Sequence, residues 1–143
     1  MPGNIDSQQI YPPSWSTRHA FGKCSGYGSA IQPGYGLEIY FDNASWLGNT
    51  VQYQFLLEKG TYVFYVTGIK RSDCGIIKWT LDGVDIITGQ DWYAASETHD
   101  VYFKVSNISV TYSGLHTLIY TVTGKNASSS GYFIGLGELG FYK

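Results

Sequence analysis

Two adjacent aromatic residues have neighbours in the sequence that could help to bind a polar ligand. Trp92 and Tyr93 directly follow Gln90 and Asp91. An aromatic ring can pack against the apolar face of a sugar, while an amide and a carboxylate form hydrogen bonds with its hydroxyl groups. The four residues therefore predict a saccharide platform. The structural alternative is a lid in which the same rings cover the core.

A second candidate for the same chemistry lies earlier in the chain. Trp46 stands three residues after Asn43 and two before Gly48, in a segment typical of a loop. Its ring could lie at the rim of a binding surface or plug the core. We therefore add Trp46 and Asn43 to the candidate ligand-binding residues.

The sequence lacks any arrangement typical of catalysis. Its three histidines are His19, His99 and His116, and none belongs to a catalytic or metal-binding motif. No Gly-x-Ser-x-Gly motif and no phosphate-binding loop is present. His116 alternates with Leu118 along a predicted strand, which favours a structural role with a satisfied hydrogen bond. We predict that the protein is not an enzyme.

We also expect no metal and no cofactor. Asp82 and Asp85 flank a predicted turn, and together with Asp73 and Asp91 they could supply oxygen ligands to calcium. The turn alone explains Asp82, and no dense run of Asp and Asn is present. A structural calcium ion is therefore the less favoured alternative.

Charge and hydropathy argue against two classes of partner. The 143 residues include 9 Lys and Arg against 11 Asp and Glu, and no basic stripe that could neutralise a phosphate backbone. No apolar run approaches the roughly 20 residues of a membrane-spanning helix. We expect neither nucleic acid binding nor membrane insertion.

The two cysteines, Cys24 and Cys74, belong to no Cys-x-x-Cys motif. One disulfide between them is an open alternative. The first thirty residues lack the layout of a signal peptide, so two free thiols in a reducing cytoplasm are favoured.

Composition and periodicity predict an all-β fold. Gly accounts for 18 residues and aromatic residues for 17% of the chain, which favours strands joined by tight turns. Asp82-Gly83 is a strong hairpin signal, and the alternation breaks over residues 88–99. The predicted strands, with period two, are 37–41, 50–57, 61–69, 76–81, 84–87, 100–112, 115–122 and 132–142. About eight antiparallel strands predict a jelly-roll β-sandwich over residues 37–143.

Residues 1–36 differ from the rest of the chain. They are rich in Gly, Pro, Ser, Gln and Tyr, with little periodicity. We predict an extended N-terminal arm that lies on its own sheet or on a neighbouring subunit. Its aromatic residues need a surface to pack against and are the candidate assembly residues. They are Tyr11, Trp15, Phe21, Tyr27 and Tyr35.

Three segments resemble the jelly rolls of carbohydrate-binding modules and galactose-binding-like domains. They are LEKGTYVFYV at 57–66, GIIKWTLDGVDI at 75–86 and VTYSGLHTLIYTVTGKN at 110–126. The same order of pieces also resembles jelly rolls of bacteriophage fibres and capsid-decorating proteins. In sugar-binding relatives, the resemblance implies a site of aromatic rings with Asp, Asn and backbone groups, at the loop rim or on the concave sheet.

Two functions from different classes follow. The leading hypothesis is a virion structural or adhesive protein, such as a capsid decoration or fibre jelly roll. It would form a homotrimer, bind a capsid or fibre protein and lie on the virion surface after synthesis in the host cytoplasm. A chain that begins at Met1 and ends one residue after its last predicted strand favours this hypothesis. The alternative is a stand-alone carbohydrate-binding module or lectin, and a fibre could also bind a cell-surface glycan.

Overall fold

The computed structural model describes residues 16–19, 23–24, 30–35, 37–42 and 47–143, with the side chains of 47–137 and 139–143. These residues form eleven strands and no helix. The strands are β1 (Ser16–His19), β2 (Lys23–Cys24), β3 (Ala30–Tyr35), β4 (Leu37–Asp42), β5 (Thr50–Leu57), β6 (Gly60–Lys70), β7 (Ile76–Leu81), β8 (Val84–Asp91), β9 (Thr98–Val110), β10 (Gly114–Gly124) and β11 (Ile134–Tyr142). Among the described residues, no helix has the length and apolarity that crossing a bilayer requires.

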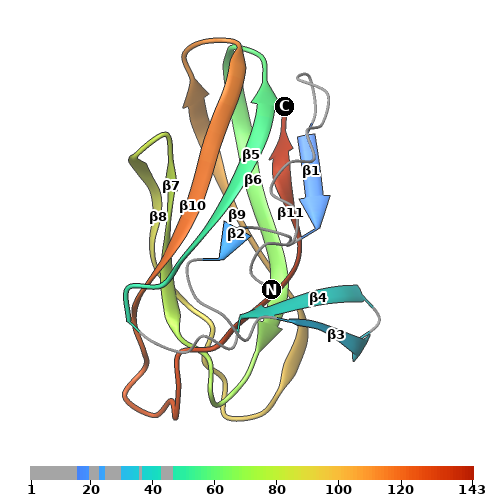
Figure 1. The fold of residues 1–143 in the computed structure, drawn as a ribbon, viewed down its shortest axis with the longest axis vertical. Helices are drawn as coiled ribbons and strands as arrows, with labels where there is room; N and C mark the ends of the chain where they lie inside the picture. The colour runs from blue at the N-terminus through green and yellow to red at the C-terminus, as the bar shows by residue number, and fades with distance from the viewer. Residues whose placement is uncertain (1–15, 20–22, 25–29, 36, 43–46) are drawn as a thin grey trace.

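The strands form two sheets that pack face to face (Figure 1). One sheet has the order β3-β4-β11-β6-β9, with β1 also paired to β11, and the other has the order β2-β5-β10-β7-β8. The β5–β6, β7–β8 and β9–β10 connections lie toward one end of the sandwich, which we name the hairpin end. The β6–β7, β8–β9 and β10–β11 connections lie at the other end, which we name the loop end. The predicted all-β sandwich is confirmed.

The eight strands predicted from residue 37 onward correspond to β4 through β11. The predicted hairpin joins β7 to β8 at Asp82 and Gly83, whose φ angles are 50° and 84°. Two consecutive positive φ angles are the requirement of a tight two-residue hairpin turn, which Asp and Gly tolerate better than other residues. The pattern of the sequence therefore located this turn correctly.

One predicted boundary is wrong, because β8 continues to Asp91 where we expected a loop. Gln90 pairs with Ile77 across the β7–β8 ladder, and both side chains are buried. A polar residue that faces the core interrupts the apolar alternation by which a strand is recognised. The buried amide of Gln90 therefore hid the end of this strand.

Three short strands lie within residues 1–36, which we expected to form an extended arm. β1 pairs with β11, β2 with β5 and β3 with β4. These parts of the segment belong to the sheets, while the arm and the division of the chain at residue 36 stay predictions. Tyr11, Trp15, Phe21 and Tyr27 lie outside the described residues, and the backbone of Tyr35 lies in β3.

Aromatic side chains fill the space between the sheets. The ring of Phe64 lies 5.2 Å from that of Trp79 and 5.1 Å from that of Phe141, measured between centroids. Trp79 is also 5.3 Å from Tyr120 in an edge-to-face arrangement, which stabilises aromatic pairs beyond their buried area. Trp79 is fully buried. Much of the aromatic content of the chain therefore serves the core.

Candidate functional site

Backbone hydrogen bonds join the three connections of the loop end. The Arg71 N–H donates to the Trp92 carbonyl at 3.2 Å, and the Trp92 N–H donates to the Gly75 carbonyl at 3.0 Å. The Gly75 N–H donates to the Phe133 carbonyl at 2.9 Å. The β6–β7 connection therefore lies between the other two and ties them into one surface.

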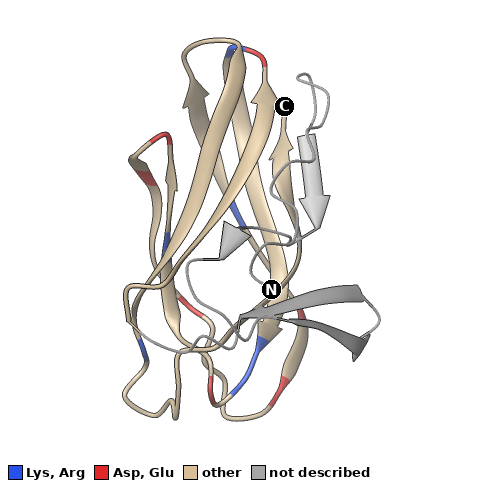
Figure 2. Ribbon diagram, viewed as in Figure 1, with Lys and Arg blue, Asp and Glu red and all other residues tan. Residues whose placement is uncertain are grey.

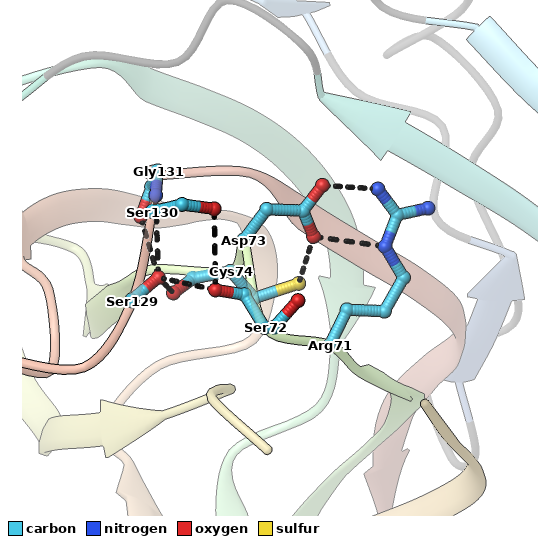
Figure 3. A network of polar contacts seen from close by, with 7 residues as sticks. All are labelled: Arg71, Ser72, Asp73, Cys74, Ser129, Ser130 and Gly131. Carbon is cyan, nitrogen blue, oxygen red and sulfur yellow. Dashed lines mark hydrogen bonds and ion pairs between the residues drawn. The ribbon is translucent and has the colours of Figure 1, made fainter. Parts of the chain in front are cut away.

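A serine-rich network strengthens this junction (Figure 3). The Ser129 hydroxyl donates to the Cys74 carbonyl at 2.7 Å and accepts from the Gly131 N–H at 3.3 Å. The Ser130 N–H donates to the Ser72 carbonyl at 2.9 Å. Because the Ser129 side chain is buried, these bonds replace those that its hydroxyl would make with water. The β10–β11 connection is thereby fixed against the start of β7.

Arg71 and Asp73 form a two-point contact within the β6–β7 connection (Figure 3). The Arg71 Nε donates to Asp73 Oδ1 at 2.8 Å, and a second guanidinium nitrogen contacts Oδ2. A forked contact of this kind fixes both side chains in one geometry. Asp73 therefore has a structural role at the base of the loop end.

Cys74 is a free, buried cysteine beside this ion pair. Burial, reinforced by the negative charge of Asp73, raises the pKa of its thiol to about 12. A thiol that stays protonated is neither a nucleophile nor a metal ligand at neutral pH. The predicted free thiol is confirmed for Cys74, while the side chain of Cys24 lies outside the described residues.

Two of the predicted ligand-binding residues lie at the surface of the loop end. Asp91 Oδ1 accepts from the Tyr93 N–H at 2.9 Å, and Oδ2 accepts from the Asn126 side-chain amide at 3.0 Å. All three residues are partly exposed. Asp91 thus links the β8–β9 and β10–β11 connections, and Tyr93 lies at the junction.

The other two predicted residues, Gln90 and Trp92, lie in the core beneath this surface. Gln90 Oε1 accepts from the indole N–H of both Trp79 and Trp92, each at 2.9 Å. Trp92 is 0% exposed and packs edge-to-face against Phe103 at 5.0 Å. Its ring has no free face for a sugar, so the structural alternative, a lid on the core, is correct for Trp92.

The sequence pattern does not identify Lys125 or Tyr132 as site residues, because Lys125 lies in a polar loop and Tyr132 opens the last predicted strand. The Lys125 Nζ lies 5.3 Å from the centre of the Tyr132 ring, and Tyr132 is partly exposed. An aromatic residue directly after a serine-rich run is the signal that could have found this position. Trp46 and Asn43 lie outside the described residues, so their role stays a prediction.

The four aspartates considered as calcium ligands do not come together. Asp82 and Asp85 lie at or beside the turn between β7 and β8, whereas Asp73 and Asp91 lie at the loop end (Figure 2). In the part of the chain that the structure describes, no three His, Cys, Asp or Glu residues form a group that could hold a metal ion. The four aspartates therefore do not form one shared site.

His116 lies at the hairpin end, at the start of β10. Its Nδ1 lies 2.6 Å from Asp82 Oδ2 and its Nε2 lies 2.9 Å from the Tyr112 carbonyl oxygen. The side chain is almost completely buried. The predicted structural role with satisfied hydrogen bonds is confirmed.

Comparisons with known proteins identify the fold. No family model and no curated protein matches the chain. The CBM36-1 domain of a multidomain xylanase from the hindgut metagenome of Trinervitermes trinervoides matches with a TM-score of 0.68 and 14% identity, over 90% of this chain and 97% of that one. A family 6 carbohydrate-binding module from Clostridium cellulolyticum, solved with xylose, matches with a TM-score of 0.58 and 20% identity, over 94% and 100%.

A Paenibacillus xanthan lyase also matches, with a TM-score of 0.67 and 20% identity, over 90% of this chain and 12% of the lyase. The chain therefore spans a small part of that enzyme. The resemblance to carbohydrate-binding modules is confirmed at the level of the fold. These comparisons do not support the resemblance to phage proteins.

Proposed function

We propose that this protein is a non-catalytic carbohydrate-binding module that binds a glycan at its loop end. The observation that carries the proposal is the extent of the structural likeness, which covers 97% of one such module and 100% of another. A fold does not select a ligand by itself. The chemistry of the loop end supplies the rest of the argument.

The loop end offers the groups that a saccharide needs. Tyr93 and Tyr132 are partly exposed rings that could pack against the apolar face of a sugar. The Ser130 hydroxyl and the Lys125 ammonium group, both exposed, could bind sugar hydroxyls. Because hydrogen bonds hold the backbone of Tyr93 and of Ser130 before binding, less conformational entropy is lost at these two positions when a ligand binds.

The same geometry favours binding over hydrolysis. A glycosidase of the usual type needs two carboxyl groups on opposite sides of the scissile bond. Among the described loop-end residues, Asp73 is held by Arg71, Asp91 is held by Tyr93 and Asn126, and Glu97 contacts His99. Each carboxylate therefore has a partner within the protein, which favours a structural role over that of a general acid.

A carbohydrate-binding module of the CBM36 type has been solved with calcium and xylotriose. We propose that glycan binding by the present protein does not need calcium, since its described aspartates are divided between two ends. EDTA should leave the affinity unchanged. Loss of binding in EDTA, restored by calcium, would contradict this part of the proposal.

A glycan array followed by titration calorimetry tests the function. We expect at least one defined glycan to bind, and Tyr93→Ala and Tyr132→Ala each to weaken binding about tenfold or more. The matched control is Tyr102→Ala, since Tyr102 is 51% exposed and stacks on Tyr65 of β6, outside the three connections. The proposal fails if no glycan binds, or if the control weakens binding as much as the loop-end variants.

The virion hypothesis stays a prediction. The described residues include no observation that favours a homotrimer, a capsid or fibre partner, or a location on a virion surface over glycan binding. Mass measurement in solution tests the assembly: a monomer with no affinity for particles would end this hypothesis.

A further inference from the structure

A cleft of about 570 Å³ opens between the last strands of the two sheets, at the hairpin end. It is lined by Val84 and Ile86 of β8, by Val105 and Ile108 of β9, and by Tyr112 of the β9–β10 connection. Sites for small ligands usually have volumes of about 300 to 1,000 Å³. The described lining residues include none from the loop-end connections, so the cleft is a separate place on the molecule.

Both strands that border the cleft are edge strands in the described sheets. An edge strand can pair with another extended chain when it is regular. Here β9 shifts register against β6 between Tyr62 and Phe64, next to Asn107 with a φ of 62°. β8 shifts register against β7 on both sides of Trp79. Bulged edges are poor templates for strand addition, which favours a compact ligand over an extended peptide.

An aromatic ring in the cleft is fixed in place before any ligand arrives. The Tyr112 ring stacks on the His116 imidazole with centroids 4.3 Å apart and an interplanar angle of 29°. His116 is itself held between Asp82 and the Tyr112 carbonyl. Tyr112 is 50% exposed. A half-exposed ring on a buried support is a preorganised stacking surface.

The polar groups of the cleft suit hydroxyl groups. Asp85 brings a carboxylate to the lining, 3.6 Å from the Lys78 Nζ, and Ser106 and Asn107 add a hydroxyl and an amide. The Asp82 carboxylate also belongs to the lining, but it is already bonded to His116 and to the Thr117 N–H. No Lys or Arg belongs to the lining that the structure describes. Carboxylates accept hydrogen bonds from hydroxyls but repel phosphate, sulfate and uronate groups. The lining therefore favours an uncharged polyol ring.

We propose that this cleft is a second saccharide site, in which the Tyr112 ring stacks on a neutral sugar and the polar lining binds its hydroxyls. The proposal rests on the proposed glycan-binding function and adds a site at the opposite end of the sandwich. One chain would then hold two saccharides without sharing any residue between the sites.

Amide chemical shifts test the second site. Isotope-labelled protein is titrated with xylotriose and, separately, with galactose. We expect two groups of shifted amides, one in the loop-end connections and one in the cleft. Tyr112→Ala should weaken binding at the cleft about tenfold or more and leave the loop-end shifts intact. Tyr112→Phe keeps the ring and should keep the cleft shifts, while Tyr102→Ala, equal in exposure to within 1%, should change neither group.

The outcomes separate the two proposals. Shifts confined to the loop end and unchanged in Tyr112→Ala overturn the second site and leave the function standing. Shifts confined to the cleft support the second site and refute the loop-end assignment. No shifts with either sugar overturn the second site, and the glycan array then decides the function on its own. Cleft shifts that grow with protein concentration in the absence of sugar show that a second copy of the chain occupies the cleft, which overturns the proposal.

Discussion

The side-chain oxygen of Gln90 accepts hydrogen bonds from two tryptophans at once. Both indole N–H groups point at its carbonyl oxygen inside the core. In Gln90→Leu, two buried donors lose their acceptor, and each unsatisfied donor costs about 1 to 3 kcal/mol. We therefore expect the free energy of unfolding in urea to fall by about 2 to 6 kcal/mol.

The matched control for this variant is Gln52→Leu, on the partly exposed face of β5. It should change the free energy of unfolding by no more than about 0.5 kcal/mol. Equal stability of Gln90→Leu and the wild type would show that the two indole contacts do not matter for folding.

Asp82 combines an unusual backbone angle with two hydrogen bonds. Its φ is 50°, and its carboxylate accepts from the Thr117 N–H at 2.9 Å and contacts His116. Asp82→Ala removes both contacts and places a residue without a polar side chain in a left-handed conformation, so we expect a loss of about 1 to 3 kcal/mol.

Asp82→Asn tests which property matters. Asn tolerates the same backbone angle and retains an oxygen acceptor for Thr117, so thermal unfolding should shift far less than in Asp82→Ala. If the two variants unfolded at the same temperature, the carboxylate charge rather than the turn geometry would dominate at this position.

The raised pKa of the Cys74 thiol predicts how the free energy of unfolding changes at alkaline pH. Burial raises the pKa of its thiol from 9.0 to about 12, so the folded state retains a proton that the unfolded state releases. The stabilisation is therefore complete below pH 9 and is lost as the pH rises from 9 toward 12. We expect the free energy of unfolding to fall across this window, and to fall less in Cys74→Ala.

A thiol reagent checks the same residue directly. In a Cys24→Ser variant, Cys74 should not react at pH 8 while the protein is folded and should react rapidly in urea. Rapid reaction of the folded protein would mean that the thiol is accessible.

At the residue scale, the sequence predicted local turns and hydrogen-bonding roles better than it predicted which side chains are buried. It identified the hairpin at Asp82 and the hydrogen-bonded role of His116 because both follow from local turn chemistry and strand alternation. It could not tell whether the Trp92 ring faced solvent or core, because that depends on Gly68 and Phe103, which reach Trp92 through pairings distant in the sequence.

At the scale of the elements, close contact between β6 and β11 depends on a residue without a side chain. A Cβ at Gly68 would lie 2.5 Å from the Gly135 carbonyl oxygen and 2.9 Å from the Trp92 ring. Gly68→Ala must therefore move β6 or displace the indole, and we expect a loss of about 1 to 3 kcal/mol in the free energy of unfolding.

The control for this prediction is Gly124→Ala at the end of β10. A Cβ there would meet no atom within 4 Å, so stability should change by no more than about 0.5 kcal/mol. A similar effect of both variants would indicate that the backbone freedom of glycine, rather than packing, accounts for the loss.

The elements themselves were largely predictable, and the candidate site was not. Period-two alternation is a local property, which is why β5 and β7 have the predicted bounds. The loop end forms where residues 71–75, 92–97 and 125–133 meet, and nothing local in the sequence states that these three segments are neighbours. The structural roles of Ser129 and Asn126 depend on the proximity of these three segments in the fold.

At the scale of the whole molecule, the topology predicts slow folding. β6 pairs with β9 from Gly60 opposite Val110, and β5 pairs with β10 from Leu57 opposite Gly114. Such pairs close long loops before they contribute stability, and β-sandwiches accordingly fold in about milliseconds to seconds. Stopped-flow tryptophan fluorescence should show this range, and folding within microseconds would contradict it.

The C-terminal residue lies at the hairpin end, where the Lys143 Nζ is 3.6 Å from Glu58 Oε2 and 5.3 Å from the centre of the Tyr62 ring. The cleft lies at the same end of the sandwich. A protein attached to a sensor chip through Lys143 would therefore turn the loop end toward the solution (Figure 1) and the hairpin end toward the support. With both proposed sites functional, surface-based assays in that orientation would report one saccharide per chain, whereas assays in free solution would report two. The choice of attachment point thus decides the apparent stoichiometry.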